Sequence, residues 1–120
     1  YDPTEQYKIV DKAKIVIGID STLLYESFSR GAKTIFCDVR PKNSFLSKTR
    51  YFAWPKKFKP SGPFWISKNK YEIINKVIKS VSNYNHEKWE KLKKKYQNSL
   101  MVFDKDNKTL KTILNNQLKN

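Results

Sequence analysis

The sequence predicts an α/β fold built on a parallel sheet, for two reasons. First, residues 14–37 contain two short apolar runs separated by a polar turn and a short helical pattern, which is the order of a β-α-β unit. Second, the apolar residues beyond residue 69 recur at helical spacing. Together these features predict a partial, Rossmann-like parallel sheet with a helical C-terminal half. With 120 residues, the chain is expected to form one domain at most.

Local signals predict the elements of the N-terminal part. Residues 3–5 are typical of a helix start, and this helix is expected to end near Ala13. The apolar run 15–17 is typical of a strand buried on both faces, as at the centre of a parallel sheet. Residues 34–37 predict a second strand of the same kind. Gly31 stands between the two strands, where a left-handed residue would end the connecting helix.

Residues 40–62 show no regular period and predict a long loop, which we call the basic aromatic loop. It holds seven Lys or Arg residues, five aromatic residues and three prolines. Loops longer than about 15 residues in compact domains usually carry function or are disordered. Residues 64–66 predict a third strand after this loop.

Residues 69–120 predict a set of C-terminal helices. Asn69 and Glu72 resemble a capping pair for the first of them, and Asn85 resembles the cap of the second. A turn at residues 104–107 precedes the last helix. Two or three strands are few for so many helices, because open α/β sheets average about five or six strands. We therefore expect the chain to be the back end of a larger α/β domain.

The net charge of +14 is unevenly distributed. Residues 1–40 are neutral, so residues 41–120 carry the whole excess, and no acidic residue occurs from residue 39 to residue 71. Such a field attracts polyanions, which include nucleic acids, anionic lipids and phosphorylated substrates. A solvated, lysine-rich surface without any partner is the alternative interpretation.

Several classes of protein are disfavoured by composition. No apolar run approaches the roughly 18–20 residues of a membrane span. The single cysteine, Cys37, has no partner for an internal disulfide, which favours a reducing compartment. With His86 as the only histidine, we expect neither a metal site nor a histidine-based catalytic triad.

The polar turn after the first strand is the main candidate site. If a helix starts here, the free amides of its first turn and the hydroxyls of Ser21 and Thr22 can bind an anion beside Asp20. Glu26, one turn further on, is placed to bind ribose hydroxyls. The alternative interpretation is that Ser21 only caps the helix and that Glu26 is an exposed first-turn acid.

The sequence of residues 21–33, Ser-Thr-Leu-Leu-Tyr-Glu-Ser-Phe-Ser-Arg-Gly-Ala-Lys, resembles the donor-site segment of GT-B glycosyltransferases. In that superfamily a strand leads into a Ser/Thr-rich turn, then a helix with a Glu, and then a Gly before the next strand. The pattern is most similar to bacterial surface-carbohydrate biosynthesis transferases. Lys33 stands where Pro is commonest, and no Gly-Gly pair precedes the helix, which disfavours a nucleotide-sugar epimerase. The resemblance covers most of the chain, although only residues 15–37 carry a sharp motif.

This resemblance implies that residues 1–120 are the nucleotide-sugar-binding part of a GT-B C-terminal domain, acting in surface polysaccharide biosynthesis. It implies that Asp20, Ser21 and Thr22 contact the donor phosphate and that Glu26 contacts the ribose or the sugar. The nucleotide sugar is then a substrate, and no cofactor is expected. A missing N-terminal domain would supply the acceptor site and the catalytic base, so no catalytic residue is assigned, and Asp20 is a weak candidate. The chain alone is expected to be inactive and cytoplasmic.

The basic aromatic loop supplies a second set of candidate residues, namely Arg50, Trp54, Lys56 and Lys57. Basic side chains interleaved with aromatic rings suit contact with an acceptor or with the anionic inner face of a membrane. They also suit nucleobase stacking, although nucleic acid is the less favoured partner. Alternatively, the aromatic rings pack on the sheet. For the chain as a whole, two functions remain as alternatives to the donor-binding role. One is a basic nucleic-acid-binding module, and the other is a non-catalytic assembly domain.

Overall fold

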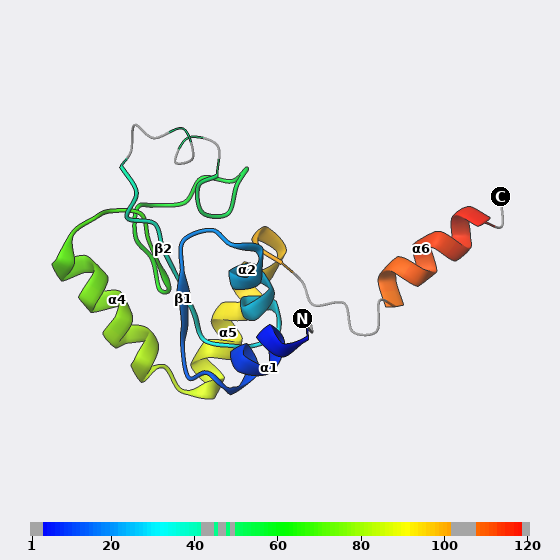
Figure 1. Ribbon diagram of the computed structural model, residues 1–120, viewed down its shortest axis with the longest axis horizontal. Helices are drawn as coiled ribbons and strands as arrows, with labels where there is room; N and C mark the ends of the chain where they lie inside the picture. Colours follow the sequence, from blue (N-terminus) through cyan, green and yellow to red (C-terminus); the bar gives the residue numbers. More distant parts are fainter. Residues whose placement is uncertain (1–3, 42–44, 46–47, 49, 102–107, 119–120) are drawn as a thin grey trace.

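The computed structural model describes residues 4–41, 45, 48, 50–101 and 108–118. Within these residues, three parallel strands form one sheet in the order β1-β2-β3, as Figure 1 shows in part. The strands are β1 (Val16–Gly18), β2 (Thr34–Cys37) and β3 (Trp65–Ile66). Ile17 pairs with Ile35, and Phe36 pairs with Trp65. The predicted α/β fold with a small parallel sheet is therefore confirmed.

Helices lie on both faces of this sheet. Figure 1 shows α4 on one side and α2 with α5 on the other, while α1 packs against α2. The helices of the described residues are α1 (Glu5–Lys12), α2 (Thr22–Ser29), α4 (Tyr71–Asn83), α5 (His86–Tyr96), the short 3-10 helix η1 (Gln97–Ser99) and α6 (Lys108–Leu118). This arrangement agrees with the predicted helical C-terminal half, and the predicted turn at 104–107 lies outside the described residues.

The ends of α2 form as its sequence predicts. Ser21 is the N-cap residue, and its side-chain oxygen accepts a hydrogen bond from the backbone amide of Leu24 at 3.3 Å. At the other end Gly31 has a φ of 98°, in the left-handed region that glycine adopts most readily. Between them, Leu24 and Phe28 are buried against the sheet. Helix α2 is therefore held by its cap, its terminating glycine and its apolar face.

Aromatic rings dominate the core on the α2 and α5 side. Phe28 stacks on Phe64 with a centroid distance of 5.3 Å, and Trp89 of α5 meets both rings edge-on. The indole of Trp89 donates a hydrogen bond to the carbonyl oxygen of Gly31 at 3.1 Å. This bond ties α5 to the end of α2, because a buried indole N–H needs an acceptor.

Two local predictions are wrong. The run 15–17 does not form a central strand, because β1 lies at the edge of the described sheet and β2 is central. Ile17 is 52% exposed, whereas Ile35 of β2 is fully buried. An apolar run shows that a strand can be buried, but only the assembled sheet decides which neighbours cover it. The predicted cap is also wrong, since Lys70 is the N-cap residue of α4 and caps it with no side-chain hydrogen bond.

The described part of the basic aromatic loop lies across the carboxyl end of the sheet. Phe52 and Ala53 are buried, and Phe52 stacks on Trp65 with a centroid distance of 5.1 Å. Trp54, by contrast, is 62% exposed. Some aromatic residues of the loop therefore pack on the core, while others remain available to a ligand.

Helix α6 lies apart from the sheet in Figure 1. Its apolar residues are all about half exposed or more, and they are Leu110, Ile113, Leu114 and Leu118. None of the helices in the described residues has the length and apolar character needed to cross a bilayer.

Candidate functional site

The carboxyl ends of the three strands meet at one edge of the sheet, because the strands are parallel. Asp20 follows β1, Asp38 follows β2, and Ser67 follows β3. Helix α2 begins at this same edge. Open α/β sheets bind their ligands in a crevice outside the carboxyl ends of the strands. This edge is therefore where a site is to be sought.

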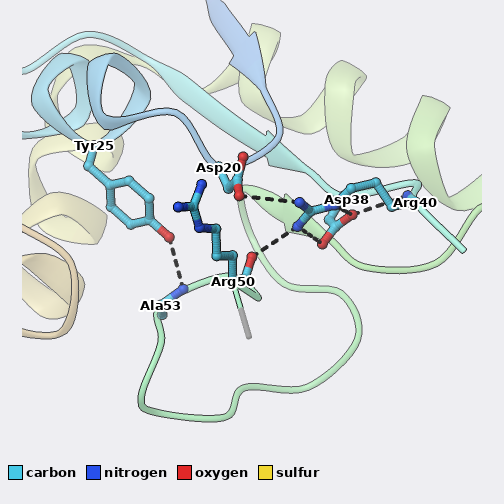
Figure 2. A network of polar contacts seen from close by, with 6 residues as sticks. All are labelled: Asp20, Tyr25, Asp38, Arg40, Arg50 and Ala53. Carbon is cyan, nitrogen blue, oxygen red and sulfur yellow. Dashed lines mark hydrogen bonds and ion pairs between the residues drawn. The ribbon is translucent and has the colours of Figure 1, made fainter. Parts of the chain in front are cut away.

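Arg40 connects the strand ends to the basic aromatic loop, as Figure 2 shows. Its guanidinium donates two hydrogen bonds to the Asp38 carboxylate, at 2.9 and 2.8 Å. The same group lies 3.2 Å from Asp20 Oδ2 and donates to the backbone carbonyl of Arg50 at 2.9 Å. One side chain thus holds the ends of β1 and β2 and the start of the 50–54 segment together.

The Arg40–Asp38 pair is charged and largely buried. The side chains of Arg40 and Asp38 are 15% and 11% exposed. Burial by itself would raise the pKa of Asp38, but the hydrogen bonds and the charge of Arg40 outweigh it, so the pKa lies below its usual value. Hydrogen bonding to Asp38 in turn raises the pKa of Arg40. Both groups are therefore ionised at neutral pH.

Tyr25 holds the same segment from the α2 side. Its hydroxyl oxygen accepts a hydrogen bond from the backbone amide of Ala53 at 3.1 Å. Ala53 has a φ of 62°, an uncommon conformation for a residue with a side chain. Burial raises the pKa of Tyr25, so the hydroxyl stays neutral at physiological pH. The segment is therefore fixed by contacts from both β2 and α2.

A cavity of about 340 Å³ opens between α2 and this segment. Its lining residues are Asp20, Thr22, Tyr25, Arg50, Tyr51 and Trp54. In Figure 2 the Arg50 side chain lies between Asp20 and Tyr25. The structure thus brings together two predicted sets of residues, Asp20 and Thr22 from the polar turn and Arg50 and Trp54 from the loop.

The cavity has the groups needed to bind an anion beside a flat ring. Arg50 makes no ion pair with any described residue, so its guanidinium is available as a donor. The amides of Thr22 and Leu23 begin α2 and have no acceptor within the helix. Arg40 pairs with both Asp20 and Asp38, so its single positive charge leaves one negative charge beside the cavity. A bound anion must therefore be held by Arg50 and the first amides of α2 against that charge. Tyr51 and Trp54 add two further aromatic side chains to the lining.

The other predicted site residues lie elsewhere. Ser21 is engaged as the cap of α2, next to the cavity. Glu26 does not line the cavity, and its hydrogen bond to the Tyr7 hydroxyl of α1 raises the pKa of Tyr7. Lys56 donates a hydrogen bond to the Ser99 hydroxyl at 3.1 Å.

Lys57 also lies outside this cavity, with its Nζ atom 5.9 Å from the centre of the Tyr51 ring. The ligand roles of all these residues remain predictions.

Sequence reasoning missed the residues that organise the site. Arg40 and Tyr25 are not among the predicted site residues, although their hydrogen bonds position the segment that lines the cavity. One signal was available, because the Asp-x-Arg sequence at 38–40 directly follows a predicted strand. Residues that directly follow a parallel strand lie at the carboxyl edge of the sheet, where α/β proteins bind their ligands. A pair of opposite charges there indicates residues that can organise a site.

A metal site has no support in the described residues, which contain no group of three or more His, Cys, Asp or Glu side chains placed to hold an ion. Asp20 and Asp38 do lie near each other, but both are engaged by Arg40.

Comparison with known proteins gives one match. Residues 1–118 match the model of a family described as "putative O-antigen biosynthesis protein". The chain belongs to this family. No curated protein and no solved structure matched the chain. The family places the chain in surface-carbohydrate biosynthesis, in agreement with the predicted pathway class.

Proposed function

We propose that the chain forms the donor-binding part of a GT-B-like glycosyltransferase, in which the cavity beside α2 binds the diphosphate and sugar of a nucleotide sugar. The observation that carries the proposal is the meeting of Asp20 and Thr22 with Arg50 and Trp54 around one cavity. The family's link to O-antigen biosynthesis supports a role in glycosyl transfer.

Each part of the cavity suits one part of such a ligand. The Arg50 guanidinium and the first amides of α2 are donors for a diphosphate. The Asp20 carboxylate is an acceptor for sugar hydroxyls. The exposed ring of Trp54 can stack on an apolar sugar face or on a base. At about 340 Å³ the cavity lies near the lower end of the roughly 300–1,000 Å³ range of small-molecule sites, so we assign to it only the diphosphate and the sugar.

Glu26 keeps a place in the proposal as a positioning residue. Its interaction with the Tyr7 hydroxyl lies between α2 and α1, and neither residue lines the cavity. A contact of Glu26 with the ribose would require that interaction to be exchanged for one with the ligand. We therefore expect Glu26→Ala to weaken donor binding less than Arg50→Gln does.

Nuclear magnetic resonance of the isotopically labelled chain tests the proposal. Uridine, cytidine and guanosine diphosphate or monophosphate sugars are titrated in turn while backbone amide and indole signals are followed. We expect one of them to shift the amides of Thr22 and Leu23 and the indole of Trp54. Arg50→Gln should weaken that binding about tenfold, because a charge-assisted hydrogen bond contributes roughly 1.5–3 kcal/mol.

Lys94→Gln on the exposed side of α5 is the matched control, since it removes one positive charge far from the cavity in sequence and element. It should leave binding unchanged. If no nucleotide sugar shifts the α2 amides, or if both variants weaken binding equally, the donor site is disproved. Salt-dependent retention on DNA that Arg50→Gln does not alter would favour the alternative of a basic nucleic-acid-binding module, with its net charge of +14.

A further inference from the structure

A second cavity, of about 480 Å³, shares the lining residue Tyr51 with the candidate site. Its lining residues are Lys48, Tyr51, Phe52, Lys57, Phe58, Lys59, Pro60 and Ser67. Because Ser67 directly follows β3, this cavity also lies at the carboxyl edge of the parallel sheet. The sheet edge thus carries two cavities that share the Tyr51 side chain as a wall.

The backbone around this cavity is fixed at several points. The indole of Trp65 donates a hydrogen bond to the carbonyl oxygen of Lys59 at 2.9 Å. The amide of Ser67 donates to the carbonyl oxygen of Pro60 at 2.7 Å. The Tyr51 hydroxyl donates to the carbonyl oxygen of Pro55 at 3.1 Å. The backbone that surrounds the cavity is therefore held in place. Hydrogen bonds join it to Trp65 of β3 and to Ser67 just after β3, and a further one lies within the loop.

Aromatic packing supports the floor of the cavity. Phe52 and Phe58 each contact the buried Trp65 ring, with centroid distances of 5.1 and 5.3 Å. The two phenylalanine rings also meet each other at 5.8 Å. Phe52 and Phe58 therefore give the cavity an apolar lining that packs on the core.

The charge around the cavity is entirely positive. Three of its lining residues are lysines, namely Lys48, Lys57 and Lys59, and no acidic residue lines it. None of the three forms an ion pair within the described part of the chain. The sequence from residue 39 to residue 71 also contains no acid that could serve as a local partner. All three lysines are exposed, and an anion bound among them would meet positive charge that pairs with no acid in the described part of the chain.

We propose that this lysine cavity binds the phosphate or diphosphate group of a second substrate, the glycosyl acceptor. This assignment rests on the proposed function, because a transferase must hold an acceptor next to its donor, and Tyr51 lines both cavities. The cavity would hold only the phosphate of the acceptor, while an N-terminal domain is still expected to supply the rest of the acceptor site. Lysine binds phosphate as a point charge, while the Ser67 side chain and the Tyr51 ring border the same space. The acceptor is either soluble or linked to a lipid, and both sources present the same phosphate chemistry.

Titration calorimetry of the whole chain with inorganic pyrophosphate tests this cavity. The measurements are made in the Arg50→Gln background, so that binding at the donor cavity is weakened about tenfold and contributes less to the heat. We expect Lys57→Gln with Lys59→Gln to weaken pyrophosphate binding about tenfold or more, since two of the three cations are lost. The affinity of the Arg50→Gln chain for pyrophosphate should also fall as the salt concentration is raised. The affinity of the variant that also carries Lys57→Gln and Lys59→Gln should fall less steeply.

Lys91→Gln with Lys94→Gln on α5 is the matched control, because it removes the same total charge from another surface. It should change pyrophosphate binding by less than about twofold. Equal losses in the two double variants, or no binding of pyrophosphate at low salt, would overturn the proposal. The result is independent of whether any nucleotide sugar binds beside α2, so failure of the donor site can be told apart from failure of this one.

Vesicle sedimentation then distinguishes the sources. The chain is mixed with phosphatidylcholine vesicles that carry either a lipid diphosphate or phosphatidylglycerol at equal surface charge. Retention only on the lipid diphosphate supports a lipid-linked acceptor. Binding of pyrophosphate in solution without retention on either vesicle supports a soluble acceptor. Equal retention on both vesicles, unchanged by Lys57→Gln with Lys59→Gln, would overturn the proposal in favour of a general attraction to anionic surfaces.

Discussion

Replacing Arg40 by Ala tests whether this side chain organises the candidate site. The substitution removes two hydrogen bonds to Asp38, one to Asp20 and one to the carbonyl of Arg50. It also leaves the Asp38 carboxylate, 11% exposed, without its counter-ion. Breaking a fully buried ion pair costs roughly 3–5 kcal/mol, and because some solvent reaches this pair we expect a loss of about 2–3 kcal/mol in the free energy of unfolding.

The loss should depend on pH in a defined direction. In the parent chain the pKa of Asp38 is lowered by folding, so its contribution to stability is present above the unfolded pKa of about 3.9 and is lost as the pH falls towards the folded value. In Arg40→Ala the backbone amide of residue 40 still donates to the Asp38 carboxylate. Burial, the largest influence on this group, is then no longer opposed by a guanidinium, so the pKa of Asp38 rises and protonation removes the unpaired buried charge. The difference in stability should therefore be largest near pH 7 and should shrink below about pH 4.

Urea denaturation followed by the fluorescence of the buried Trp65 and Trp89 measures this difference. Arg30→Ala is the control, because Arg30 pairs with Asp11 at a more exposed position, where the side chains are 29% and 45% exposed. It should cost less than about 1 kcal/mol. An Arg40→Ala variant within about 0.5 kcal/mol of the parent, or a deficit that stays constant with pH, would refute the role assigned to Arg40.

Three further predictions concern other parts of the fold. Tyr25→Phe should destabilise the chain by about 1–2 kcal/mol in urea denaturation and weaken ligand binding beside α2, since the Ala53 amide loses its acceptor. Gly62→Ala should cost about 1–3 kcal/mol by the same assay, because a Cβ atom there would lie 2.2 Å from the ring of the buried Trp65. Alkylation of Cys37 by iodoacetamide should reach half its maximal rate at a pH above that of a free cysteine, because burial raises the thiol pKa.

Each of these predictions has an outcome that contradicts it. A Tyr25→Phe variant as stable as the parent would show that the hydroxyl does not hold the loop. For Gly62→Ala, the control is Ser61→Ala, an exposed neighbour that should be nearly neutral, and equal effects of the two would dismiss the predicted clash. An alkylation midpoint at or below the value of free cysteine would show that the thiol is more accessible than the structure indicates.

Sequence patterns carried the prediction of the elements but only part of the prediction of the site. The cap at Asn85 was foreseen, and its side chain does accept a hydrogen bond from the Lys88 amide at 2.7 Å. The predicted cap at Asn69 is wrong, because α4 begins at Tyr71 with Lys70 as its N-cap residue and with no side-chain hydrogen bond there. Caps depend on one side chain reaching one amide, so a favourable residue type permits the bond without enforcing it.

The candidate site shows the same limit at longer range. Asp20 and Thr22 were predicted from the turn after the first strand, and Arg50 and Trp54 from the composition of the loop. Nothing in the sequence joined these two sets, which are about thirty residues apart. Arg40 and Tyr25 make the link by hydrogen bonds. Arg40 donates to the backbone carbonyl of Arg50, and the Tyr25 hydroxyl accepts from the backbone amide of Ala53. Backbone acceptors and donors exist at every residue, so sequence alone does not show which of them a side chain will find.

The sequence by itself determined the order and kind of the elements, the α/β class and the concentration of positive charge after residue 40. These properties follow from local periodicity, capping residues and composition, which act over a few neighbouring positions. Only the tertiary structure decided that β2 rather than β1 is central, that Arg40 joins two strand ends to the loop, and that Tyr51 lines two cavities. Those outcomes depend on which distant surfaces pack together, and packing is a property of the whole folded chain.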